Sequence, residues 1–244
     1  MAPDEEADEL VAAAPDAGAL AAMLARRVSG EPLAWITGTT TFCGYTVGVR
    51  PGVYVPRWQS EALARTACHL LPGRGTAVDL CTGSGAVALV LQAGRPGARV
   101  VATESDPVAV ACARSNGVDV RIGDLDAPLP VDLAGRVDVL CGVLPYVPRD
   151  ALHLLPRDVV AHEPRTALDG GAAGLDLISR AVSASTRWVA PGGWLLLEAG
   201  GGQFPAVRDL FARAGYGGIR VLDDGDGDPR VVCGRLGPAG VHPD

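Results

Sequence analysis

The segment from 78 to 89, VDLCTGSGAVAL, holds the residues whose types and spacing most clearly suggest chemistry. A buried strand ends near Asp79, and a glycine-containing turn leads into a helix. Glycines permit positive φ angles and a close approach of the backbone to a ligand, and a helix N-terminus offers unpaired N–H groups. An acid before such a loop repels a pyrophosphate but attracts an ammonium group. The segment predicts a site for the amino acid end of S-adenosylmethionine, formed by Asp79, Cys81, Thr82, Gly83, Ser84 and Gly85.

Two better-known nucleotide motifs do not match this loop. Cys81 replaces the first glycine of the dinucleotide pattern G-x-G-x-x-G, and G-K-[ST] of the P-loop is absent. The chain has no lysine, since all 21 basic residues are arginine. A lysine Schiff base, a lysine general base and a P-loop phosphate clamp are therefore excluded.

A second acidic position follows the loop at the spacing expected for a ribose. Glu104 ends the strand VVATE about 20 residues further on, where a carboxylate can accept both ribose hydroxyls. Ser105 follows it directly. The third strand ends at Gly123, and Asp124 and Leu125 come where an adenine can bind. The loop and these residues together predict an adenosine-containing cofactor and no metal.

The elements that must position these residues alternate between strands and helices from residue 76 onward. Strands with continuous apolar character between helices indicate a parallel sheet that is covered on both faces. Two consecutive strands near the C-terminus suggest an antiparallel edge. The expected strands are 76–80, 98–104, 118–123, 136–143, 192–200, 217–224 and 229–236, and residues 145–164 are expected to be irregular. Before them, the β-rich segment 38–56 is expected to form a hairpin that turns at Gly44–Tyr45.

Composition excludes several classes of protein. The 244 residues are 48% hydrophobic and 20% charged, which suits a packed domain, and the formal charge of −7 is unfavourable for binding a nucleic acid backbone. The acidic N-terminus does not resemble a signal peptide, and no apolar run is long enough for a membrane span. Six scattered cysteines are typical of free thiols. We therefore expect a cytoplasmic protein with no nucleic acid or membrane partner, as a monomer or homodimer.

Several stretches resemble the HemK/PrmC family of protein-(glutamine-N5) methyltransferases, which are class I S-adenosylmethionine-dependent enzymes. The similarity spans roughly residues 30–236. It is carried by GEPLAWITGTTTFCGYTVGVRPGVYVPR, VDLCTGSGAVAL, VVATESDPVAVACARSNG, VDVLCGVLPYVP and HEPRTALDGGAAGLDLI.

The resemblance implies an α/β, Rossmann-like fold with a seven-stranded, mostly parallel sheet and an antiparallel C-terminal hairpin. The pattern of elements along the chain predicts a short helical lead (1–37), a β-hairpin with a connecting helix (38–74), a catalytic domain (75–236) and a tail (237–244). The resemblance agrees with this catalytic domain. It also implies S-adenosylmethionine as cofactor. Asp79 would then lie at the methionine end, Glu104 at the ribose, and Asp124 with Leu125 at the adenine.

Two departures from the family pattern bear on the acceptor. The family motif Asn-Pro-Pro-Tyr aligns with Val143-Leu144-Pro145-Tyr146, and valine cannot accept the N–H bonds that the asparagine receives from a planar substrate nitrogen. The helical domain before the hairpin is also short. We expect backbone carbonyls near Pro145 and the Tyr146 ring to retain part of the site.

Acidic residues are the candidates to replace the missing asparagine, because a carboxylate accepts N–H hydrogen bonds and can take a proton. Glu163 is predicted to be catalytic together with Val143, Pro145 and Tyr146. The predicted substrate-binding residues are Arg57, Trp58, Glu61 and Glu198.

The two departures favour a small-molecule acceptor with a guanidine or amide nitrogen, such as free arginine, in secondary metabolism. Two alternatives stay open. The first is methylation of a protein glutamine, with other groups in place of the asparagine, which would make the partner a protein. The second is a catalytically idle scaffold that binds the cofactor.

Overall fold

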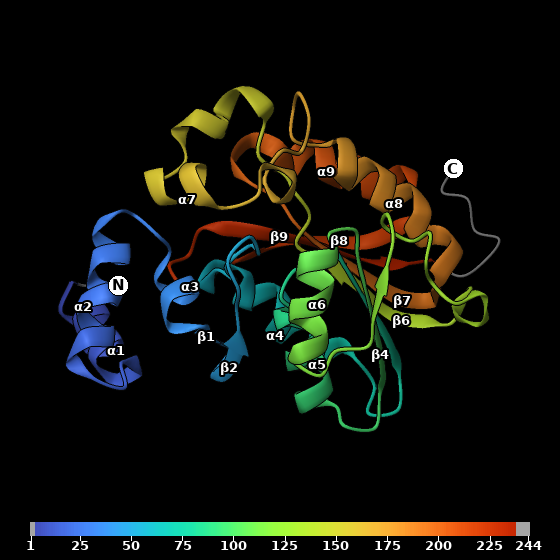
Figure 1. Cartoon of the computed structure of the whole chain (residues 1–244). Coiled ribbons are helices and arrows are strands. Elements are labelled where there is room, and N and C mark those ends of the chain that lie inside the picture. The colour runs from blue at the N-terminus through green and yellow to red at the C-terminus, as the bar shows by residue number, and fades with distance from the viewer. Residues whose placement is uncertain (1–2, 238–244) are drawn as a thin grey trace.

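A computed structural model describes residues 3–237, and a mixed sheet of seven strands forms its centre (Figure 1). The strand order is β5-β4-β3-β6-β7-β9-β8. The first five strands in this order run parallel, and β9 and β8 are antiparallel additions. The sheet confirms the predicted fold class. Its strands are β3 (Thr76–Leu80), β4 (Arg99–Glu104), β5 (Val120–Ile122), β6 (Val137–Gly142), β7 (Val189–Glu198), β8 (Tyr216–Asp223) and β9 (Pro229–Leu236).

Helices cover both faces of this sheet, which explains why its central strands are apolar without alternation. Neighbouring residues of β6 show this, since Val139 packs into one core cluster and Leu140 into the other. Figure 1 shows the two helical layers on opposite sides. One layer contains α4 (Glu61–Leu70), α5 (Ala86–Gly94) and α6 (Pro107–Ser115), and the other contains α8 (Asp176–Trp188) and α9 (Phe204–Arg213).

The order of the strands places a crevice beside the end of β3. From β3 the chain continues outward to β4 and β5, and then returns to the other side of β3 to form β6 and β7. Loops that leave the carboxyl ends of adjacent strands in opposite directions open a crevice at this point, and ligands bind there in doubly wound sheets.

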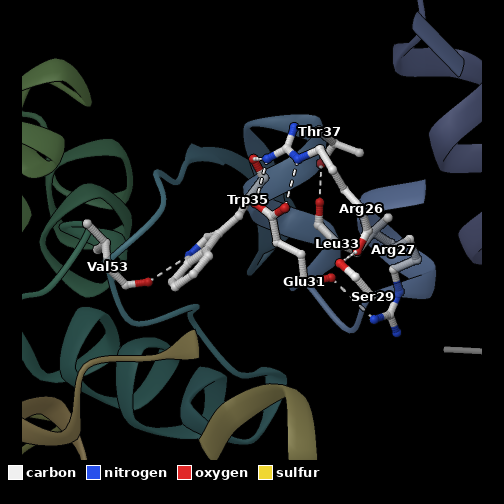
Figure 2. Close-up of polar contacts among 8 residues, drawn as sticks. All are labelled: Arg26, Arg27, Ser29, Glu31, Leu33, Trp35, Thr37 and Val53. Carbon is white, nitrogen blue, oxygen red and sulfur yellow. Dashed lines mark hydrogen bonds and ion pairs between the residues drawn. The ribbon is translucent and has the colours of Figure 1, made fainter. Parts of the chain in front are cut away.

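The N-terminal part precedes the sheet as three helices and a hairpin, namely α1 (Pro3–Ala13), α2 (Ala17–Val28), α3 (Leu33–Thr37), β1 (Thr39–Phe42) and β2 (Tyr45–Gly48). Figure 2 shows how this lead is held in place. The Arg26 guanidinium donates hydrogen bonds to the Glu31 carboxylate, at 2.7 Å from Nε to Oε2. The Trp35 indole donates to the Val53 carbonyl at 2.9 Å. Trp35 therefore ties the lead to the segment that leads into α4 and the seven-stranded sheet.

Two local expectations differ from the structure. The hairpin turn lies at Cys43–Gly44, one residue before the expected Gly44–Tyr45, because both turn residues have positive φ angles, of 52° and 83°. The stretch from 145 to 164 contains a 3-10 helix, Arg149–Leu154, and the helix α7, Arg157–His162. Prolines occupy the N-cap position of both helices, where the missing N–H removes no intrahelical hydrogen bond.

The predicted tail is Gly237 plus residues 238–244, and the latter lie outside the described residues. Between residues 3 and 237, none of the helices combines the length and apolar character that crossing a membrane requires.

Candidate functional site

A cavity of about 550 Å³ lies at the carboxyl ends of the central strands. It joins the two groups of residues that the sequence singled out. On the predicted cofactor side its lining includes Asp79, Cys81, Thr82, Gly83, Ser84, Glu104, Ser105, Asp124 and Leu125. On the predicted acceptor side it includes Arg57, Trp58, Val143, Pro145, Tyr146 and Glu198.

Asp79 lies at the floor of the cofactor side with only 1% of its surface exposed. The Thr82 hydroxyl donates to its Oδ2 at 2.5 Å, and the Ala88 backbone N–H donates to the same oxygen at 3.2 Å. Both hydrogen bonds go to Oδ2, so within residues 3–237 the other oxygen, Oδ1, is left for a ligand. Burial raises the pKa of Asp79 to about 7, although these two hydrogen bonds lower it. A bound cation would favour the ionised form of this carboxyl.

The loop between β3 and α5 adopts a backbone that depends on its glycines. Gly83 and Gly85 have φ angles of 58° and 87°, and Cys81 has 54°. Gly85 does not line the cavity but precedes α5, and a Cβ there would lie 2.8 Å from Val118 Cγ2 and 3.3 Å from Ala113 Cβ. In the described part of the chain, nothing lies within 4 Å of a Cβ at Gly83. Gly85 is thus required for packing against α6 as well as for its φ angle.

These two glycines give a matched pair of alanine variants. Gly83→Ala adds backbone strain alone, about 1 kcal/mol, whereas Gly85→Ala adds a steric conflict of a further 1–3 kcal/mol or so. We expect Gly85→Ala to lower the free energy of unfolding in urea more than Gly83→Ala. Equal losses for both variants would contradict the packing role of Gly85.

Glu104 connects its strand to the glycine loop. Its Oε2 accepts a hydrogen bond from the Gly83 backbone N–H at 2.9 Å, and its Oε1 accepts from the Ser105 N–H at 2.8 Å. Each carboxylate oxygen can accept more than one hydrogen bond, so ribose hydroxyls can still bind. The carboxylate therefore holds the loop next to the cavity.

Asp124 and Leu125 follow β5 and line the predicted cofactor side of the cavity. Leu125 is buried with a φ angle of 46°, and the Asp124 carboxylate pairs with Arg180 at 2.6 Å at the surface. An exposed ion pair of this kind contributes little to stability. Asp124 can thus turn toward a ligand at small cost.

On the predicted acceptor side, Tyr146 and Glu198 form a pair. The Tyr146 hydroxyl donates to Glu198 Oε1 at 2.8 Å. Burial raises the pKa of Glu198, while Ser60, Tyr146 and Arg230 each lower it. Burial also raises the pKa of Tyr146, next to this carboxylate. Tyr146 therefore stays protonated, and its ring and hydroxyl form one wall of the cavity.

Glu163 and Glu61 do not line the cavity. The Glu163 side chain is 1% exposed and forms an ion pair with Arg57, which does line the cavity. Burial raises the pKa of Glu163, and the Arg57 charge opposes that rise. Glu61 accepts the Cys43 backbone N–H at 2.7 Å and pairs with Arg65. Both carboxylates thus hold neighbouring structure rather than face an acceptor.

The lining residues that sequence reasoning missed include Tyr54, Ser60 and Arg230. Tyr54 lies in the segment GVYVPR and packs against Arg57, whose Cζ atom is 5.3 Å from the centre of its ring. Its place close to Pro56-Arg57, which was predicted to lie near the acceptor, could have indicated that Tyr54 lines the cavity. Arg230 comes from β9, far along the chain, and only the sheet order brings it to the cavity.

Comparison with known proteins identifies the relatives of this chain. No family model matches it. A release factor glutamine methyltransferase from Geobacter sulfurreducens is 38% identical over 221 residues, which are 88% of this chain and 77% of the relative. The enzyme of that name from Salmonella typhimurium is 36% identical over 224 residues, 90% of this chain and 80% of the relative. A methyltransferase structure from Pyrococcus furiosus shares the fold, with a TM-score of 0.59 at 18% identity over 89% of this chain and 99% of that one.

These relatives overturn the leading prediction about the acceptor. The expectation of a small-molecule acceptor such as free arginine, with a role in secondary metabolism, is wrong, because the relatives are named for the glutamine of a protein release factor. The same finding corrects the expected partner. Both expectations gave too much weight to Val143 and to the short helical lead, two local differences in a chain that matches these relatives over most of its length.

The predicted resemblance is confirmed by identity well above 30% across most of the chain. The seven-stranded sheet with its antiparallel hairpin agrees with it. This chain belongs to the release factor glutamine methyltransferase family and is a methyltransferase of the S-adenosylmethionine-dependent class.

Proposed function

We propose that this protein transfers a methyl group from S-adenosylmethionine to the side-chain nitrogen of a glutamine in a peptide chain release factor. The S–CH3 bond breaks as the C–N bond forms, S-adenosylhomocysteine leaves, and the amide nitrogen loses one proton to solvent. The observation that carries the proposal is the single cavity that joins the β3–α5 loop to the segment from Val143 to Tyr146. The relatives named above support the choice of acceptor.

The residues on the cofactor side fit S-adenosylmethionine. Ser84 Oγ is buried without a hydrogen-bond partner among residues 3–237, and Gly83 leaves open space where a side chain would otherwise stand. Asp79 would bind the ammonium group and Glu104 the ribose hydroxyls. Asp124 and Leu125 would flank the adenine, while Cys81, Thr82, Gly85 and Ser105 would shape the loops. When bound, the sulfonium supplies a methyl group that is already electrophilic.

The protein's own task is then to bind the acceptor amide, orient it and exclude water. Tyr146 would lie against the planar amide, and backbone carbonyls near Pro145 would accept one of its N–H groups. The exposed Trp58 ring lies at the cavity, where it would contact the protein that carries the glutamine. Arg57 is held by the buried Glu163 and would form the part of the cavity wall between Tyr146 and Trp58.

The direct test uses the full chain, S-adenosylmethionine and a purified release factor whose acceptor glutamine is unmodified. We expect mass spectrometry of the digested release factor to find one added methyl group, on one glutamine. A release factor with that glutamine changed to alanine is the control, and it should gain nothing. An unmodified release factor, in the presence of a chain that binds the cofactor, would refute the proposal.

A further inference from the structure

Glu198 is a buried carboxyl group that lines the cavity and has one oxygen without a hydrogen-bond partner. Only 1% of the residue is exposed. The Tyr146 hydroxyl occupies Oε1, whereas Oε2 accepts no hydrogen bond of regular geometry among residues 3–237. The Ser60 hydroxyl lies near enough to lower the pKa of the group, but it forms no regular hydrogen bond. A buried carboxylate oxygen without a donor is unfavourable unless a ligand supplies one.

Arg230 lowers the pKa of Glu198 through its charge, but among residues 3–237 it forms its ion pair with another carboxylate. Arg230 lines the same cavity, but its Nε pairs with Asp224 Oδ2 at 2.9 Å. Asp224 is in turn fixed by the backbone N–H groups of Asp226 and Asp228. In the described part of the chain, Glu198 forms no ion pair, so its free oxygen keeps its capacity to accept a hydrogen bond.

The sheet register places Glu198 beside the position that lacks a polar side chain. The last paired residues of β6 and β7 are Gly142 and Leu197. Val143 and Glu198 each follow one residue later, on two parallel strands that end at the same edge. Val143 offers no acceptor, whereas its neighbour across the register offers a carboxylate. Glu198 is also held by pairing with Val231 of β9, so its backbone is part of the rigid sheet.

An amide nitrogen needs hydrogen-bond acceptors in order to be held for methylation. The nitrogen is planar and carries two N–H donors in the plane, so acceptors for both donors present one face of the nitrogen to the methyl group. A carboxylate forms a stronger, charge-assisted hydrogen bond with such a donor than a neutral carbonyl does.

We propose that Glu198 Oε2 accepts a hydrogen bond from the N–H of the acceptor amide and thereby fixes the plane of that amide beside Val143. The inference rests on the proposed function and adds a specificity-determining residue to it. Tyr146 holds the carboxylate through Oε1, so Oε2 is the oxygen that remains for the acceptor.

The test compares Glu198→Ala, Tyr146→Phe and the double variant Val143→Asn/Glu198→Ala, with a release factor as acceptor. We expect Glu198→Ala to lower kcat/KM by roughly 10- to 100-fold, the value of one hydrogen bond to a charged group. The dissociation constant for S-adenosylmethionine, measured by calorimetry, should change by no more than about 2-fold, since Glu198 lies on the acceptor side. In the double variant, the asparagine side chain introduced by Val143→Asn should restore at least a large part of the loss.

The other variants separate a direct contact from a structural role. Tyr146→Phe removes the hydroxyl that donates to Glu198 but leaves the carboxylate, so it should lower kcat/KM less than Glu198→Ala does. Asp138→Asn serves as a carboxyl-to-amide control, because Asp138 lies near the other end of β6 and accepts the Thr76 N–H.

Three outcomes overturn the inference. One is that Glu198→Ala leaves kcat/KM unchanged. Another is that Tyr146→Phe lowers kcat/KM as much as Glu198→Ala does. The third is a failure of Val143→Asn to restore any activity to a Glu198→Ala chain that still binds the cofactor. A wild-type chain that binds the cofactor but leaves the release factor unmethylated refutes the proposed function itself, which distinguishes the two failures.

Discussion

Replacing Asp79 by asparagine is expected to weaken S-adenosylmethionine binding by about 100-fold or more, with the fold intact. The proposed partner of Asp79 is the ammonium group of the cofactor, and loss of one charge from a buried pair removes 2–5 kcal/mol or so of binding free energy. Asparagine keeps the shape of the side chain and an oxygen that can accept from Thr82 and Ala88. The loss is therefore one of charge rather than of structure.

In the absence of cofactor, the Asp79→Asn substitution should not lower the free energy of unfolding at neutral to alkaline pH, in contrast to its effect on binding. Burial raises the pKa of Asp79 from 3.8 to about 7, so the folded chain retains a proton that the unfolded chain releases. Stability that depends on this group is present at acidic pH and declines as the pH rises toward 7. The side chain introduced by Asp79→Asn does not titrate, so the variant should be at least as stable as the wild type near pH 8 or so.

Binding should depend on pH through the same carboxyl. From about pH 6 to 7.5, the affinity of the wild type for S-adenosylmethionine should increase, because Asp79 ionises while the cofactor amine is still protonated. The variant should lack this increase. Calorimetry at several pH values measures both effects, and Asp138→Asn is again the control. Wild-type affinity in Asp79→Asn would contradict the proposed contact.

The sequence predicted the sheet well because its strands are buried on both faces. The β3 segment, TAVDL, is largely apolar up to its acid, and the bounds of this strand, Thr76–Leu80, agree with the prediction. The positions of Asp79 and Glu104 followed directly, since adjacent parallel strands end at the same edge. On the cofactor side, the apolar pattern of each strand and the order of the strands in the sheet both place these acids at the same edge.

The acceptor side was harder to predict because its contacts join distant segments. Glu163 was expected to face the acceptor, but it is separated from Arg57 by 106 positions and pairs with it beneath the surface. Glu198 stands beside Val143 only through the pairing of β6 with β7. A single sequence shows which carboxyl groups exist, whereas the sheet register decides which of them lines the cavity.

The pair formed by Arg57 and Glu163 leads to an asymmetric prediction. The Glu163 side chain is 1% exposed and that of Arg57 is 32% exposed. Arg57→Met leaves a carboxylate buried without its cation and should lower the free energy of unfolding by about 3 kcal/mol near pH 8. Glu163→Gln leaves an arginine that can turn toward water, so it should cost no more than about 1 kcal/mol.

The pH dependence of the Arg57→Met variant separates lost charge pairing from lost packing. Burial already raises the pKa of Glu163, and removal of Arg57 removes a charge that lowers it. The folded variant then keeps a proton that the unfolded chain loses above a pH of about 4.5, so its stability falls as the pH rises. Urea unfolding should therefore find that Arg57→Met loses less unfolding free energy, relative to the wild type, at about pH 5.5 than at about pH 8.

The double variant Arg57→Met/Glu163→Gln provides the decisive comparison. The glutamine that it introduces carries no charge, so the double variant should recover most of the stability that Arg57→Met loses at high pH, and its remaining deficit should not change with pH. A deficit in Arg57→Met that is the same at both pH values, and that Glu163→Gln does not relieve, would contradict the electrostatic origin. It would assign the role of Arg57 to its packing against Tyr54 instead.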